Sequence, residues 1–187
     1  EEAVLVVTSL TAVAVLFAHT GVINGWSLGQ MIVLLGVYYL LQGAQSVVFE
    51  MSIERFMEHI RVGTLDFILI KPINSQFYVS TRHVQMAQVA QIFFGIALVV
   101  VGVGQVGAVV GPGEVARFAL TLICGLSLVY SLVMVLGTVA FWATRIENLL
   151  AIFWSFLDAG RFPVDIYPGW LRVTLSTVVP IGVAVTI

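Results

Sequence analysis

The chain alternates long apolar runs with one concentrated charged segment. Of its eight Lys and Arg and ten Asp and Glu residues, seven fall within residues 50–74. Only 10% of all residues are charged and 60% are hydrophobic, whereas a soluble domain carries roughly 25% charged residues. So few charges cannot cover a water-exposed surface, and most of this surface must therefore face lipid. The net charge of −2 also argues against a nucleic-acid partner.

The apolar runs predict an all-α membrane protein with about six transmembrane helices. A helix needs roughly 20 apolar residues to cross the hydrocarbon core. The predicted spans are about 3–23, 28–49, 84–110, 117–142, 146–158 and 173–187. The fifth is short for a full crossing, and the chain starts and stops inside apolar runs. We therefore expect residues 1–187 to form one domain that is incomplete at both ends, with the lone Cys124 buried and inert.

Residues 50–82 are predicted to be the cytoplasmic segment. If they are inside, five of the eight Lys and Arg residues lie on that side, namely Arg55, Arg61, Lys71, Arg82 and Arg145. Positive residues favour the cytoplasmic side of membrane proteins. This bias places the N-terminus inside and residues 158–172 outside.

The first part of this segment predicts an amphipathic helix over residues 50–62. Its apolar residues recur at i, i+3, i+4 and i+7, which places Ile53, Phe56, Met57 and Ile60 on one face. Charged residues occupy the other positions, namely Glu54, Arg55, Glu58 and Arg61. Ser52 can cap the start of this helix and Gly63 can end it. The mixed charges suit docking to a protein partner, and the alternative is a helix that rests on lipid.

Two further groups of residues are unusual for a membrane chain. Glutamines cluster near the inner ends of the second and third spans, at Gln42, Gln45, Gln85, Gln88 and Gln91. They predict either hydrogen bonds between helices or the polar lining of a path. The outer segment carries Pro163, Tyr167, Pro168 and Trp170, and its prolines prevent one continuous helix. We expect either a re-entrant element that caps the outer mouth or an ordinary loop.

No catalytic or metal-binding constellation can be read from the sequence. The pattern G-x-x-x-x-G-K-[ST] is missing, and the single lysine, Lys71, follows Ile70. Backbone amides in that loop cradle nucleotide phosphates. ATP must therefore be bound by another chain if the protein uses it, and no cofactor is expected here.

The stretch "GTLDFILIKPIN" resembles the cytoplasmic signature of type-two ABC transporter permeases. The matching residues are Gly63, Thr64, Leu65, Asp66, Leu69 and Pro72. The later "RFPVDIYPGWLRVTLSTVVP" is similar to the outer segment before the sixth span in that family. The closest subgroup is the bacterial "ABC-2 family transporter protein" permeases.

The resemblance implies the transmembrane subunit of an ATP-driven exporter in the bacterial inner membrane. Its partners would be an ABC ATP-binding subunit, which holds ATP and Mg, and a second permease in a homo- or heterodimer. The residues that couple to the ATPase would be Glu54, Arg55, Glu58, Arg61, Gly63, Asp66 and Pro72. Cargo would be amphipathic or polymeric, moved by alternating access. The alternative is an ATP-independent membrane scaffold or assembly subunit, which explains the composition but not the signature.

Overall fold

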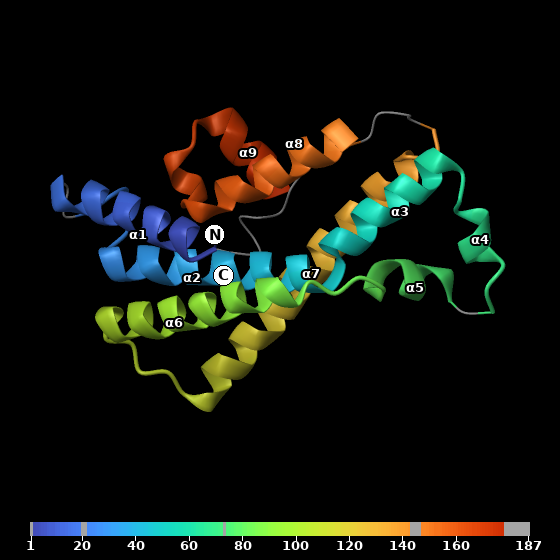
Figure 1. Ribbon diagram of the computed structural model, residues 1–187. Coiled ribbons are helices and arrows are strands. Elements are labelled where there is room, and N and C mark those ends of the chain that lie inside the picture. The colour runs from blue at the N-terminus through green and yellow to red at the C-terminus, as the bar shows by residue number, and fades with distance from the viewer. Residues whose placement is uncertain (1, 20–21, 73, 143–146, 178–187) are drawn as a thin grey trace.

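The computed structural model describes residues 2–19, 22–72, 74–142 and 147–177, and this part of the chain is predominantly helical (Figure 1). The α-helices are α1 (Glu2–His19), α2 (Leu28–Gln45), α3 (Met51–Val62), α4 (Asp66–Leu69), α5 (Ser75–Thr81), α6 (Val89–Val106), α7 (Pro112–Val139), α8 (Glu147–Asp158) and α9 (Gly169–Thr177). A π-helical segment, η1 (Ser46–Glu50), joins α2 to α3. Three short 3-10 segments are η2 (Met86–Gln88), η3 (Ala159–Arg161) and η4 (Val164–Ile166).

Three helices in the described part are long and apolar enough to cross a membrane. They are Leu28–Val62, Met86–Val106 and Pro112–Val139, and Val4–His19 is a shorter apolar helix. The 12 residues of α8 measure about 18 Å, less than the roughly 30 Å of hydrocarbon. Most of the predicted sixth span lies outside the described residues. The six-span count therefore stays a prediction.

The helix boundaries differ from the sequence prediction at two places. No break separates the second span from the amphipathic helix, because α2, η1 and α3 form one helix of 35 residues. Ser52 is consequently inside a helix, and its predicted role as a start cap is wrong. Helix α7 begins at Pro112 rather than near residue 117, since proline is well tolerated in the first turn. The Gly111 amide donates to Glu114 Oε2 at 2.9 Å, which caps this start.

Helices α2 and α6 lie side by side and antiparallel, and they approach each other closely at glycines (Figure 1). A Cβ atom added to Gly36 would lie 2.7 Å from the backbone nitrogen of Val99, and one added to Gly95 would lie 2.7 Å from that of Leu40. Similar close contacts occur seven residues before and after Gly36 on α2, at Gly29 and Gly43, and seven residues after Gly95 on α6, at Gly102. Small residues allow helix backbones to pack this closely in lipid, where van der Waals contact replaces the hydrophobic effect.

The other helices pack around this pair. Helix α1 packs on α2 through Val6 and Val13, and Ser9 Oγ lies 2.8 Å from the Tyr39 hydroxyl. Helix α7 crosses behind α2 and runs along α3 (Figure 1). There it forms the largest apolar cluster, made of Phe49, Ile53, Met57, Val129, Val133, Leu150, Phe153 and Leu175.

Contacts between loops show which segments lie together at each end of the molecule. At one end the Asn24 side chain donates to the Asp165 carbonyl at 3.2 Å, and Gly29 lies against Val106. At the other end the Phe56 and Phe141 rings are 6.4 Å apart. The segments predicted to be outside therefore share one end, and those predicted to be cytoplasmic share the other. Which end faces the cytoplasm stays a prediction.

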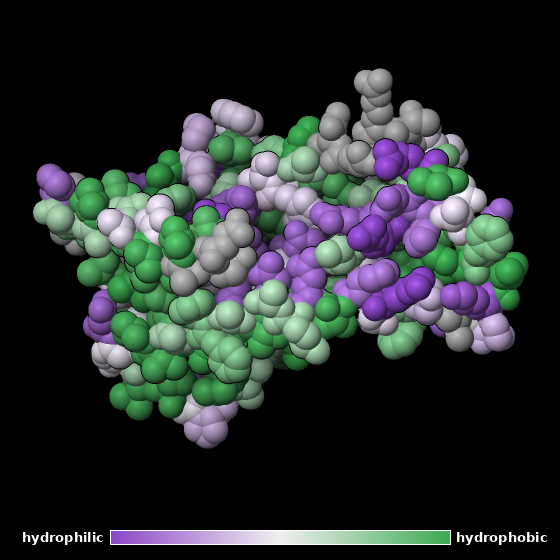
Figure 2. All heavy atoms as spheres, in the orientation of Figure 1, coloured by the Kyte–Doolittle hydropathy of each residue, from purple (hydrophilic) through white to green (hydrophobic). Residues whose placement is uncertain are grey.

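The described surface is apolar where α6 and α7 lack helical neighbours. Figure 2 shows hydrophobic atoms over much of one half of the molecule and hydrophilic atoms gathered near α3 and α5. Phe93 on α6 and Leu120 on α7 are 68% and 62% exposed. Cys124 is also exposed on α7, so its predicted burial is wrong: the apolar run that surrounds it faces outward. These faces are available to lipid or to a second subunit.

The glycine contacts generate a stability prediction. Gly36→Ala should destabilise the protein by about 1–3 kcal/mol, because the new methyl group meets backbone rather than a movable side chain. Gly104→Ala is the matched control on α6, where nothing lies within 4 Å of an added Cβ. Thermal unfolding in lipid nanodiscs measures both. Equal midpoints for the two variants would show that the close α2–α6 contact does not stabilise the fold.

Candidate functional site

Helix α3 continues α2 directly and is held along one side by other helices of the same chain. Ile53 and Met57 are 1% and 6% exposed and pack in the cluster with Val129 and Val133 of α7. Leu150 and Phe153 of α8 complete this contact. The apolar stripe that the sequence predicted is therefore covered by protein, and lipid does not reach its centre.

The opposite side of α3 carries the predicted charged residues. Glu54, Arg55, Glu58 and Arg61 are all exposed. Arg55 Nη1 and Glu58 Oε2 form an ion pair of 3.0 Å in which both side chains are about half exposed. An exposed pair of this kind is worth less than about 1 kcal/mol. Charges of this kind contribute little to the fold, and their place on the surface suits recognition.

The end of α3 is set by Gly63. This residue adopts a left-handed conformation with φ of 74°, as the sequence prediction required. The Gly63 amide donates to the Ile60 carbonyl at 3.2 Å, and the Thr64 amide donates to the His59 carbonyl at 2.9 Å. These two bonds form a Schellman motif, which ends a helix and fixes the direction of the following chain. A Cβ at Gly63 would meet no atom within 4 Å, so the constraint there is the backbone angle alone.

The turn that follows α3 has buried residues that attach it to the protein and exposed residues on its outer side. Leu65 and Ile68 are buried with Val79 of α5, and Phe56 and Ile60 pack against them. Between these anchors the chain presents Asp66, Phe67, Leu69, Ile70, Lys71 and Pro72, all of which are exposed. Lys71 Nζ donates to the Tyr78 hydroxyl at 2.9 Å and lowers the pKa of that tyrosine. The signature residues therefore form a supported tip whose apolar side chains face outward.

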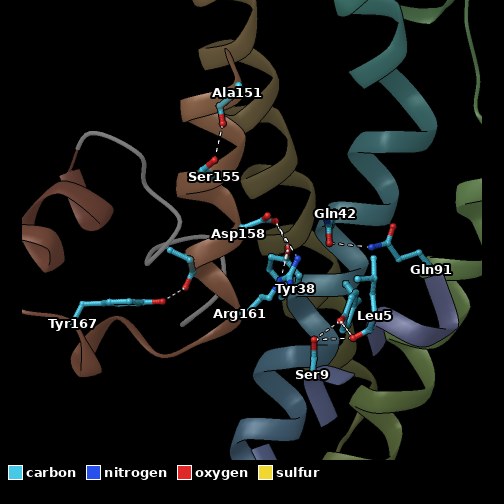
Figure 3. A network of polar contacts seen from close by, with 12 residues as sticks. Leu5, Ser9, Tyr38, Gln42, Gln91, Ala151, Ser155, Asp158, Arg161 and Tyr167 are labelled. Atoms are coloured by element: carbon cyan, nitrogen blue, oxygen red, sulfur yellow. Dashed lines mark hydrogen bonds and ion pairs between the residues drawn. The ribbon is translucent and has the colours of Figure 1, made fainter. Parts of the chain in front are cut away.

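The glutamines divide into a bonded pair and three others. Gln91 Nε2 donates to Gln42 Oε1 at 2.9 Å, which joins α6 to α2 (Figure 3). This is the interhelical bond that the sequence offered as one alternative. Gln45 is buried, and Gln88 Oε1 is buried without a partner among the described residues. Gln85 is held through its backbone, whose N–H donates to the Val47 carbonyl at 3.3 Å. A role in lining a path stays a prediction for all five.

The predicted outer segment reverses the chain after α8. Pro163 is fully buried and the Tyr167 hydroxyl donates to the Ala159 carbonyl at 2.9 Å, whereas Trp170 is 70% exposed. Pro168 precedes α9, which returns so that Leu175 reaches the cluster around Phe153. The irregular stretch thus turns the chain back toward α8. Irregular backbone is tolerated at membrane depth when protein covers it.

A polar network that sequence reasoning missed ties this segment to the middle of α2. The Tyr38 hydroxyl donates to Asp158 Oδ1 at 2.6 Å, and Arg161 Nε donates to the Tyr38 oxygen at 3.1 Å (Figure 3). Arg161 Nη2 lies 3.4 Å from Asp158 Oδ1. Tyr38 lies about 15 Å along α2 from Leu28, so the first residues of the predicted outer segment reach the middle of this helix. Asp158 and Arg161 were visible in the sequence, but nothing there pointed to Tyr38.

The match to a family model decides what kind of protein carries this arrangement. A model described as ABC-2 family transporter protein matches residues 3–187. The chain belongs to this family. The resemblance drawn from the 63–72 signature is thereby confirmed, and the chain is a membrane component of a transporter. No curated protein and no solved structure matches it.

We searched this ABC-2 family chain for nucleotide-binding and metal-binding sites. Its sequence has no P-loop. In the ranges that the structure describes, no group of three or more His, Cys, Asp or Glu residues could hold a metal ion. What the geometry does provide is a charged helix face, a shaped tip, and polar contacts between spans. These features suit binding and movement.

The network around Tyr38 generates a second prediction. Tyr38→Phe should destabilise the protein by about 1–2 kcal/mol, because it removes hydrogen bonds to two ionised groups in a low-dielectric setting. Tyr39→Phe is the matched control: it is the next residue on α2, is equally buried, and its hydroxyl bonds Ser9 and the Leu5 carbonyl in the described part of the chain. Its expected cost is near 0.6 kcal/mol. Heat-induced unfolding in nanodiscs compares the two, and an equal or larger loss for Tyr39→Phe would argue against an energetic role of the charged partners.

Proposed function

We propose that this chain is the permease subunit of an ATP-driven exporter in the bacterial inner membrane, and that α3 with the 63–72 tip is its docking surface for a separate ABC ATP-binding subunit. One observation carries the proposal. The charged face of α3 is exposed while its apolar face packs against α7 and α8. The backbone of α3 is continuous with α2, which is apolar and long enough to span a membrane.

This arrangement supports transmission of movement from a partner to the spans. The helix from Leu28 to Val62 has 35 residues and is about 52 Å long. A push on its charged end would act on α2 through a continuous backbone. The same push would act on α7 and α8 through Ile53 and Met57, which are packed against them. Packed interfaces shift between discrete arrangements rather than deforming smoothly.

The π-helical segment η1 is the natural place for this helix to adjust. It lies between the part of the helix that packs on α6 and the part that packs on α7 and α8. Single-turn π segments recur at functional sites in α-helices. Buried Ser46, at the start of η1, donates a hydrogen bond to Glu50 at its end. We place the hinge of the coupling movement here.

Hydrolysis itself belongs to the partner. ATP and Mg would be held by the ABC ATP-binding subunit, since this chain lacks the phosphate-cradling loop. A second permease, identical or related, would complete the path, because one protomer of this size cannot enclose a route for a large substrate. Exposed apolar faces of α6 and α7 supply area for that contact or for lipid.

Two other groups take supporting roles in this proposal. Gln45, Gln85 and Gln88 would line an inward-facing vestibule, and the buried unpartnered Gln88 Oε1 supports a neighbouring water or cargo group. Pro163, Tyr167, Pro168 and Trp170 would cap the outer mouth as part of a re-entrant element. Two contacts support this assignment: the Asn24 side chain bonds the Asp165 carbonyl from the turn before α2, and the Tyr38 network holds the start of the segment against α2 itself. The cargo would be amphipathic or polymeric.

The left-handed Gly63 provides the first test. Gly63→Val should leave membrane insertion intact but uncouple ATP hydrolysis from transport, since a β-branched residue is strained at a φ of 74°. Gly63→Asn is the matched control, because asparagine tolerates this conformation. The measurement is ATPase activity and cargo movement together, in vesicles that contain the permease and its ATPase. Normal coupling in Gly63→Val would contradict the assignment of the tip.

The charged face provides a second test that does not depend on the backbone. Reversing Glu54, Glu58 and Arg61 together should weaken ATPase binding at least about tenfold, since each exposed pair contributes up to about 1 kcal/mol. Reversing Glu114 and Arg117, an exposed pair at the opposite end, is the control and should change nothing. Affinity is measured by titrating the ATPase against nanodiscs. If no ATPase binds the native chain, or if the triple reversal binds normally, α3 is not the docking surface and the scaffold alternative gains support.

A further inference from the structure

A basic groove lies beside α3, on the side that faces the chain between α5 and α6. It has a volume of about 390 Å³ and is lined by Arg55, Glu58, His59, Thr64, Arg82 and His83. Two guanidinium groups and two imidazoles thus gather around a single carboxylate. That carboxylate, Glu58, is already paired with Arg55. Beyond this ion pair the groove holds the Arg82 guanidinium and no second carboxylate.

Hydrogen bonds and a cation–π contact hold the residues that line the groove. Ser52 Oγ accepts from the His83 amide at 3.0 Å and lies 3.2 Å from the His83 carbonyl. The Gln85 amide donates to the Val47 carbonyl at 3.3 Å. His59 Nδ1 lies 2.8 Å from Thr64 Oγ1, and the Arg82 guanidinium lies over the Tyr78 ring at 5.1 Å. The side chains that line the groove are therefore positioned before any ligand arrives.

The electrostatics of His83 agree with this geometry. Burial lowers the pKa of His83 from its usual 6.5, and the charges of Arg82, Arg55 and His59 lower it further. Positive neighbours that disfavour a proton also favour an anion. A phosphate group bound here would therefore be attracted by both arginines and would promote protonation of His83.

The position of the groove indicates where such an anion would come from. His83 is followed at once by Val84 and Met86, which are 49% and 74% exposed. Met86 begins the apolar helix Met86–Val106 that is long enough to span a membrane. The groove thus lies where a span ends, at the level of lipid headgroups, with exposed apolar side chains beside it for acyl chains.

We propose that this groove binds the phosphate of an anionic phospholipid, with Arg55 and Arg82 as its principal contacts and His59 and His83 beside them. A phosphodiester with an uncharged headgroup fits the excess of cationic groups. A choline headgroup brings its own positive charge and is disfavoured there. The inference does not depend on the proposed transport activity, because lipid binding can be measured without ATP or a partner.

The test uses the full chain in nanodiscs of phosphatidylcholine with a minor share of phosphatidylglycerol. After transfer to detergent, native mass spectrometry counts the lipids that stay bound. We expect retention of phosphatidylglycerol over phosphatidylcholine, and a loss of about fivefold for each of Arg55→Gln and Arg82→Gln. Arg117→Gln, at the other end of the molecule, is the control and should keep the preference. A native chain without preference, or a preference unchanged in the Arg55→Gln, Arg82→Gln double variant, overturns the proposal.

Two further experiments distinguish a bound lipid from other bound anions. Inorganic phosphate and glycerophosphoglycerol should compete poorly, because neither has acyl chains, and Val84→Ser with Met86→Ser should weaken lipid retention while both arginines remain. Equal displacement by free phosphate would show a site for a soluble anion instead. If the arginine variants lose only binding of the ATPase and keep the lipid preference, the groove serves an acidic protein partner and the lipid assignment fails.

The pH dependence gives an independent readout. The phosphodiester keeps its charge across this range, whereas His83 gains a proton only as the pH falls toward its pKa, which burial and the neighbouring charges hold below 6.5. Preference for phosphatidylglycerol should therefore rise between pH 7.5 and about 5, and His83→Gln should reduce that rise. Arg55, Glu58 and His59 from α3 and Arg82 from the end of α5 face the same groove. A pH-independent preference in the native chain would exclude His83 from the site.

Discussion

The close contact between α2 and α6 is the interaction on which the other features depend. In lipid, two apolar helices gain little from the hydrophobic effect, so they associate through van der Waals contact over a well-fitted surface. Glycines on both helices bring backbone atoms together at Gly36 and Gly95. Because α6 returns antiparallel to α2, the intervening chain of residues 46–85 must leave and rejoin the pair at one end. The charged segment is therefore held at a fixed place by the close contact between these two helices.

That fixed end explains why one amphipathic helix can serve several purposes. The apolar stripe of α3 is used within the chain, against α7 and α8. Its charged side remains exposed, and one edge of it forms a groove with Arg82 and His83. Helix, tip and groove thus share one support. A partner on the charged face and a lipid in the groove would both act on the same helix, which offers a physical route for lipid composition to affect coupling.

Two hydrogen-bonded networks join helices of the described chain. Gln42 and Gln91 bond across the α2–α6 contact, and Tyr38 joins Asp158 and Arg161 across the α2–α8 contact. Water is not available there to satisfy a polar group that loses its partner. Such bonds consequently specify which helices are neighbours more than they add to total stability. The two networks start about one turn apart on α2, at Tyr38 and Gln42, and join that helix to the segment after α8 and to α6.

The sequence by itself determined the membrane class, the amphipathic helix, its end at Gly63 and the family, because each follows from local composition, period or backbone preference. A Schellman ending is set by a few consecutive residues, and apolar runs report the solvent directly. Only the tertiary structure decided that α3 continues α2, that its stripe faces protein, and that Cys124 is exposed. It alone also brought Tyr38 to Arg161 and Arg55 to Arg82. These outcomes depend on which helices become neighbours, and in a chain that is apolar on nearly every side, hydrophobic periodicity cannot distinguish a face toward protein from a face toward lipid.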